Sequence, residues 1–171
     1  IASGLADVNA QIAEMQGNTE TAALIQFDQS NLELRKRLAE DGNTAGLAQL
    51  DTLRNLVQLQ AQYNALNTEA ARIQSDLALA EERIRNSREA GAITELGMLQ
   101  QLAAARTAAG QQLAVVADQM QAVAAASGSP EQLQGVRQLG GAIDQLASQT
   151  DLVGQKFKAV FEDGLGSAIE G

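Results

Sequence analysis

The residue types that carry most enzymatic chemistry are missing from this chain of 171 residues. It contains no His, no Cys and no Trp, so the usual general base, the thiol nucleophile and the imidazole or thiolate metal ligands are all absent. The Ser and Tyr hydroxyls therefore have no imidazole to activate them. We predict that the chain has no catalytic residue and is not an enzyme.

The carboxylates and glycines that are present do not form a recognisable ligand set. Neighbouring acids at 40–41 and 162–163 could hold a hard cation, but neither pair has the Gly-punctuated, alternating-oxygen spacing of a calcium loop. The glycines in the segment 164–166 are followed by no Lys and preceded by no strand pattern, which argues against a phosphate cradle. We therefore predict no metal ligands, no cofactor-binding residues and no cofactor.

The elements that would position any functional residue are helices. The chain is 45% hydrophobic but only 2% aromatic, and it is rich in Ala, Leu and Gln, which extend helices at little cost in side-chain entropy. Small Ala and mid-sized Leu suit a thin seam between helices better than a thick core. The single proline, Pro130, follows Ser129 and marks a helix start rather than a break. An elongated, all-α fold is expected.

A heptad ladder at alternating three- and four-residue spacing runs through the middle of the chain. Such a ladder keeps one narrow face of a helix against a partner helix, which is typical of a coiled coil. At a rise of ~1.5 Å per residue, the helix expected over about 44–89 would be roughly 70 Å long. Its predicted seam residues are Leu56, Leu59, Tyr63, Leu66, Ala70, Ile73, Leu77, Ala80 and Ile84.

The ladder fails after Ile84, because the same register would place Ser87 and Gly91 in the seam. Gly91 suits a helix C-cap and Thr94 suits the N-cap of a new helix. A connection this short folds two helices back to back. We therefore predict an antiparallel hairpin that turns at Gly91 to Thr94.

Two further seams follow this turn. Their residues are Leu99, Leu102, Arg106, Ala109, Leu113, Val116, Met120 and Val123, and then Val136, Leu139, Ile143, Leu146, Thr150, Val153, Phe157 and Val160. We expect the stem of Arg106 to line the seam while its guanidinium reaches water. Ser129 is expected to cap the last helix with Gln132 as its capping-box partner. Glycines at 135, 140, 141 and 154 weaken that helix, and close packing against neighbouring helices is the simplest compensation.

Residues 1–42 are expected to form short helices, one of them over about 3–16. A second helix, capped by Thr19, carries a seam in which Asn31 lies among apolar residues. A buried Asn in a seam fixes register and strand number, so Asn31 is a register candidate; the alternative is a solvated residue in a short helix. The chain thus divides into short N-terminal helices over 1–42, a long helical hairpin over 43–126, and a C-terminal amphipathic helix over 127–171 that leads into a region absent from this sequence.

The charge balance limits the partners. The net charge is −9, with 21 acidic against 12 basic residues, and the basic residues cluster only at 35–37. A phosphate backbone would be repelled, so we expect no specific nucleic-acid binding. The longest weakly polar run, 113–126, is too short to span a bilayer, so membrane contact is expected only through regions outside this segment. The charges at 81–89 sit at helical spacing and predict intrahelical ion pairs on a solvated face.

Two stretches resemble tail tape measure proteins of long-tailed bacteriophages. The residues of 88–96, inside Ala/Gln-rich helices, resemble the helix-to-helix turns of that family, and 156–165 resembles its segments in which a helix with paired aromatics leads into an apolar region. The resemblance implies an internal or C-terminal-side piece of a longer virion protein, assembled in the host cytoplasm and held in several copies in the tail lumen or tip. It would set tail length, leave ahead of DNA during ejection, and contact tail tube and tail tip proteins.

Two other classes of function compete with this interpretation. A coiled-coil interaction module of a bacterial secretion system or toxin would share the seams and the charge. An enzyme fragment would need a catalytic constellation, which the sequence lacks. The seams are compatible with parallel or antiparallel pairing, within one chain or between chains. The expected fold is therefore all-α, with elongated coiled-coil helices and antiparallel hairpin turns, as a single chain or as a homotrimer or other small homo-oligomer.

Overall fold

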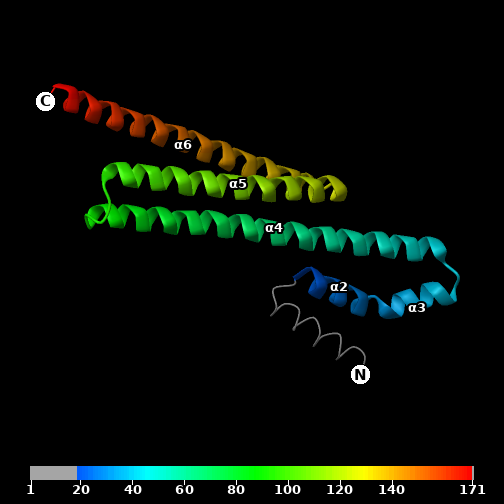
Figure 1. Ribbon diagram of the computed structural model, residues 1–171. Helices are drawn as coiled ribbons and strands as arrows, with labels where there is room; N and C mark the ends of the chain where they lie inside the picture. Colours follow the sequence, from blue (N-terminus) through cyan, green and yellow to red (C-terminus); the bar gives the residue numbers. More distant parts are fainter. Residues whose placement is uncertain (1–18, 171) are drawn as a thin grey trace.

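The computed structural model describes the backbone of residues 19–170 and the side chains of residues 20–151. The described residues form helices with short connections, and no strand occurs among them. In chain order the helices are α2 (Thr19–Ser30), α3 (Leu32–Glu40), α4 (Thr44–Glu89), α5 (Glu95–Ser127) and α6 (Pro130–Glu170) (Figure 1). The prediction of an all-α fold is thus confirmed for this part of the chain. The helix expected over about 3–16 lies outside it.

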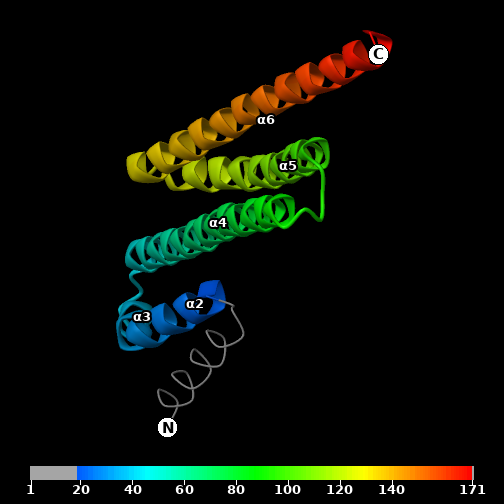
Figure 2. The same cartoon turned by 90° about the vertical axis from the view of Figure 1, so that its left-hand side faces the viewer.

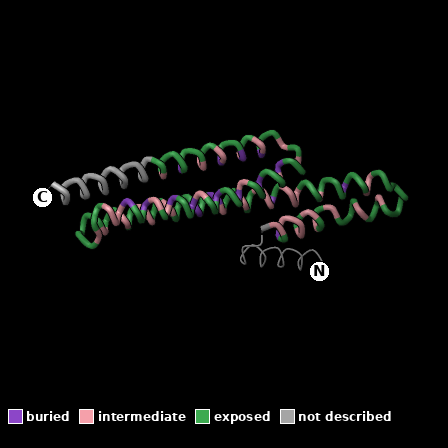
Figure 3. Tube along the Cα trace, turned by 45° about the horizontal axis from the view of Figure 1, so that its top comes forward, coloured by how far each residue is buried: buried purple, intermediate pink, exposed green. Residues whose placement is uncertain are grey.

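The long helices stack side by side, and α5 lies between α4 and α6 (Figures 1 and 2). α5 runs back along α4, and α6 runs back along α5. The short helices α2 and α3 cover the opposite side of α4, near its N-terminal end. One hydrophobic core joins α4, α5 and α6, and burial along the chain is concentrated on the faces that these helices turn toward one another (Figure 3).

The turn between α4 and α5 is built by local hydrogen bonds. Gly91 has a φ of +77°, a left-handed conformation that glycine adopts without a Cβ clash. Its N–H donates to the Arg88 carbonyl at 3.0 Å and that of Ala92 donates to the Ser87 carbonyl at 2.9 Å, the pattern of a Schellman cap. The Thr94 hydroxyl then accepts from the N–H of Gly97 at 3.0 Å and caps α5. These caps end one helix and start the next within five residues.

The seam expected through Asn31 differs from the structure. The chain breaks between α2 and α3 at this residue, and its Nδ2 donates to the Phe27 carbonyl at 2.9 Å, one turn back. Leu34, an apolar residue three positions after Asn31, is 47% exposed. The side-chain amide of Asn31 thus donates to the backbone of the preceding helical turn rather than to a facing helix. This bond therefore does not fix the alignment of one helix against another.

Polar contacts and buried apolar residues, among them Ala22 of α2 and Leu50 of α4, together hold α2 and α3 against α4. Arg54 forms two hydrogen bonds to Asp28, at 2.8 and 3.1 Å. Arg35 pairs with Asp51 at 3.0 Å. The apolar cluster in this region consists of Ala22 with Ile25 packed against it. Half-exposed ion pairs contribute only about 0.2 to 1 kcal/mol each, so we infer that these two helices are bound less firmly than the three-helix core.

Replacement of Gly91 by Ala is expected to destabilise the fold, because an L-residue in the left-handed region costs about 1 to 2 kcal/mol. The matched control is Gly141→Ala, where an added Cβ meets no atom within 4 Å in an ordinary helical conformation. That change should stabilise by about 1 kcal/mol. Urea unfolding followed by circular dichroism measures both; equal effects of the two variants would contradict the turn conformation.

Candidate functional site: the interhelical seam

One face of α5 is buried along most of its length. Its buried residues are Leu99, Leu102, Arg106, Ala109, Leu113, Val116, Met120 and Ala124. Three- and four-residue steps alternate as far as Met120, after which the stripe continues at Ala124, while Val123, the residue expected from the spacing, is half-buried. This face is covered by α4 and by α6, so it is more completely buried than the seam face of either neighbour.

The α4 residues of the ladder are covered unequally. Ala70 and Ile73 are buried, and Tyr63, Leu66 and Leu77 are partly buried against the same core. Four other ladder residues were expected there as well: Leu59, Ala80 and Ile84 are half-buried, whereas Leu56 is 41% exposed.

The exposure of Leu56 corrects its assignment to the seam, and the cause is the length of α5. Gln60, one turn further along α4, lies beside the α5–α6 turn, because Nε2 of Gln132 donates to its Oε1 at 2.9 Å. α4 therefore projects past the end of α5 (Figure 1), so α5 does not extend over Leu56, which is 41% exposed.

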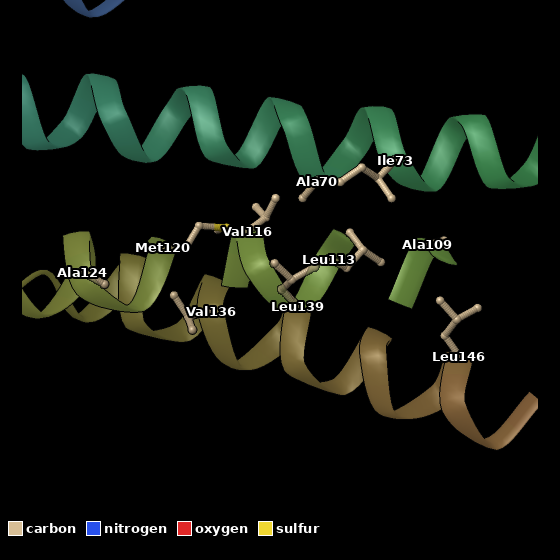
Figure 4. Close-up of a cluster of buried hydrophobic side chains, with 10 residues drawn as sticks. All are labelled: Ala70, Ile73, Ala109, Leu113, Val116, Met120, Ala124, Val136, Leu139 and Leu146. Carbon is tan, nitrogen blue, oxygen red and sulfur yellow. The ribbon is translucent and has the colours of Figure 1, made fainter. Parts of the chain in front are cut away.

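The third wall of the core comes from α6. Val136, Leu139 and Leu146 are buried, and Ile143 packs partly against the core. Figure 4 shows the three buried side chains of α6 meeting those of α5, with Ala70 and Ile73 of α4 on the other side. Leu113 and Met120 are the largest fully buried side chains in the described part of the chain. Phe157, also predicted in this seam, lies outside the described side chains.

A charged pair lies inside the α4–α5 interface. Nε of Arg106 donates to Oε1 of Glu81 at 2.7 Å, and the two side chains are only 10% and 16% exposed. Arg85 approaches the second carboxylate oxygen of Glu81 at 3.5 Å. The expectation that the guanidinium of Arg106 reaches water is therefore wrong, because α4 covers it and supplies a carboxylate. Removing one partner of a buried pair typically costs about 3 to 5 kcal/mol.

A second buried polar contact lies at the opposite end of the core. Gln132, 4% exposed, donates from Nε2 to Gln60 and accepts at Oε1 from the Ser127 hydroxyl at 2.7 Å. Ser129 accepts from the Gln132 N–H at 3.4 Å, as an N-cap does. The side chain of Gln132 does not complete the expected capping box, because the Ser129 N–H donates instead to the Ser127 hydroxyl. This amide thus joins α4 to the α5–α6 turn.

Close backbone approach occurs at one of the α6 glycines. A Cβ built on Gly135 would lie 1.9 Å from Oη of Tyr63 and 3.2 Å from its Cζ, whereas nothing lies within 4 Å of a Cβ on Gly140 or Gly141. The compensation expected for the α6 glycines therefore applies at Gly135, where the missing side chain lets Tyr63 of α4 reach α6.

The space between α4 and α6 is an open groove. Neutral amides form much of its walls, among them Asn67 and Gln74 of α4 and Gln134 and Gln138 of α6, and Glu131 is the one charged residue lining it. Amides can hydrogen-bond water or another polypeptide, but they supply neither a nucleophile nor a general base. The groove walls are therefore suited to hydrogen bonding with water or with another polypeptide.

The exposed charges of α4 act within the helix. Arg72 pairs with Glu69 and with Asp76, and its hydrogen bond holds the pKa of Glu69 below the ordinary value. A depressed carboxylate pKa stabilises the folded state at neutral pH, and this contribution is lost as the pH falls through that pKa. Both side chains are well exposed, so the pair is a surface feature.

Truncation of Leu113 to Ala is expected to cost about 2 to 5 kcal/mol, because this side chain is 1% exposed and would leave a cavity between three helices. Val115, two residues away on α5 and 58% exposed, is the control. Val115→Ala should change stability by less than about 0.5 kcal/mol. Thermal and urea melts that fail to separate the two variants would refute the assignment of the buried face.

Replacement of Gly135 by Ala should destabilise the fold, since the new methyl group would overlap Tyr63. Overpacking of this kind costs about 1 to 3 kcal/mol. Tyr63→Phe removes the closest atom, so the double variant should recover part of the loss in a double-mutant cycle. Additive effects of the two substitutions would show that the two residues do not touch.

Comparison with known proteins identifies no relative: no family model, curated protein or solved structure matches this chain. In the described part of the chain, no three His, Cys, Asp or Glu residues come together as a metal site would require. None of the described helices combines the length and the apolar character needed to cross a membrane.

Proposed function

We propose that this chain is a structural segment of a tail tape measure protein of long-tailed bacteriophages, without enzymatic activity, which occupies the tail lumen or tip and is released as DNA is ejected. The observation that carries the proposal is the location of residues 88–96 at a connection between two helices. This stretch resembles the helix-to-helix turns of that family, and in the structure it spans the end of α4, the turn and the start of α5.

The arrangement of the helices favours a folded domain near the tail tip over an extended ruler. Laid end to end, the five helices would span about 210 Å, whereas α4, the longest of them, spans about 70 Å. α5 and α6 fold back within this stack instead of extending it (Figure 1). A segment that contributes so little length per residue is poorly suited to measure length by itself.

Two surface properties support the same role. The net charge of −9 repels DNA, so a domain that must leave the tail ahead of the genome would not adhere to it. Leu53, Leu56, Leu79 and Val115 are large apolar side chains that remain exposed, and they could contact further copies or tail proteins. The seam spacing on α5 supports antiparallel coiled-coil packing within each copy, with a homotrimer or other small homo-oligomer as the assembled form.

The folded-back hairpin also suits a second candidate, a coiled-coil interaction module of a bacterial secretion system or toxin. The two candidates differ in where the chain is found. Mass spectrometry of purified long-tailed particles from the genome that encodes the chain should detect its peptides, and particles that have ejected their DNA should have lost them. Peptides found only in secreted material, and not in virions, would favour the second candidate and contradict the first.

An in-frame deletion of residues 43–126 separates the tip domain from the ruler. A ruler made of a continuous helix would shorten the tail by about 125 Å when these 84 residues are removed. For a folded tip domain we expect the remaining tails to keep their length, with a loss of assembly or ejection. Electron microscopy of the deletion particles measures this, with a parent phage as the length standard.

A further inference from the structure

The apolar seam of α5 does not by itself fix how far α5 slides along α4. Its residues recur every seven positions, so a shift of one heptad places Leu, Ala and Val again opposite similar residues. Two contacts break this repetition: the Glu81–Arg106 pair near one end of the core and the Gln132–Gln60 bond near the other.

A one-heptad slip in either direction would separate Arg106 from Glu81. Arg106 would face Arg88, a like charge, or Gln74, a neutral amide. The Glu81 carboxylate would face Leu113 in the first case and Leu99 in the second. Both leucines are nearly fully buried, so the carboxylate would exchange Arg106 for an apolar neighbour and keep only the longer, more exposed contact with Arg85 on its own helix, which is unfavourable.

The amide contact independently opposes one of these two slips. Gln132 is buried and bonded at both ends of its side-chain amide, to Gln60 of α4 and to Ser127 of the α5–α6 turn. A slip that sets Gln132 opposite Leu53 would leave its Nε2 without an acceptor, whereas the opposite slip would bring it to Asn67. The caps at Gly91 and Thr94 would also have to move, but they are solvent-exposed and can be satisfied by water.

We propose that the Glu81–Arg106 pair and the Gln132–Gln60 bond form a two-point register lock, which selects one of several heptad-related alignments of α4 and α5. Buried polar contacts of this kind contribute little net stability compared with well-packed apolar residues, yet they penalise misaligned states. The lock therefore decides which arrangement forms, while the apolar seam provides the stability. This inference does not depend on the proposed function.

The test measures alignment separately from stability. The chain has no Cys, so cysteines introduced at the exposed positions Ser75 on α4 and Gln112 on α5 would be the only sites for spin labels. A slip of seven residues displaces one label along the other helix by about 10 Å. The variants to compare are E81L/R106L, Q60L/Q132L, and the combination of all four substitutions. The control is E69L/R72L, which removes an exposed ion pair from α4.

In the labelled parent and in the control we expect a single distance between the two spin labels. In the combined variant we expect a second distance as well, which corresponds to a shift of one heptad. The combined variant should melt at a temperature no lower than that of the parent. A single parental distance in the combined variant would overturn the proposal. If the combined variant does not fold, E81L/R106L becomes decisive. Below its melting temperature it should show a displaced minor population that is absent from the parent, and the absence of that population would equally overturn the lock.

Discussion

The burial of one face of α5 between two other helices is the constraint on which the rest of the structure depends. Leu113 and Met120 are fully enclosed only because α4 supplies Ala70 and Ile73 on one side while α6 supplies Val136, Leu139 and Leu146 on the other. Burial of apolar area contributes roughly 25 cal/mol per Å², so a pair of these helices without the third would leave part of the stripe in water. The three helices therefore stabilise one another as a unit, and two ion pairs and a smaller set of buried apolar residues attach α2 and α3 to it.

A seam made of Leu, Ala and Val stabilises the packing of two helices, but its heptad repeat is compatible with several alignments of α4 and α5. The buried polar groups favour one of these alignments. Arg106 interrupts the seam at a cost in packing, and its guanidinium is accommodated because Glu81 lies opposite. At the opposite end of the core, Gln132 provides a second buried polar contact, because its amide joins the α5–α6 turn to α4. Tyr63 and Gly135 add a steric constraint, because a side chain at Gly135 would overlap the hydroxyl end of Tyr63 and force that ring to shift.

These properties are mechanical rather than chemical. The described surface offers open, amide-walled grooves and exposed ion pairs, which suit contact with other helices. In the proposed role as a tape measure segment near the tail tip, the net charge of −9 would disfavour adhesion to DNA. The folded-back connections matter for this proposal, because they place the long helices side by side and so reduce the length that the segment spans.

The sequence by itself determined the helical class and the position of the α5 face, because the side of a helix on which a residue lies depends only on the 3.6-residue period. Local chemistry at Gly91 and Thr94 likewise determined where α4 ends and α5 begins. Only the tertiary structure decided which parts of each face are covered. Leu56 shares the heptad spacing with Ile73, yet it is exposed because α5 ends before reaching it. Glu81 and Arg106 are 25 residues apart, and Gln60 and Gln132 are 72 apart, so no local spacing could pair them. Their contacts exist because the helices fold back at one alignment, and that alignment is a property of the packed core.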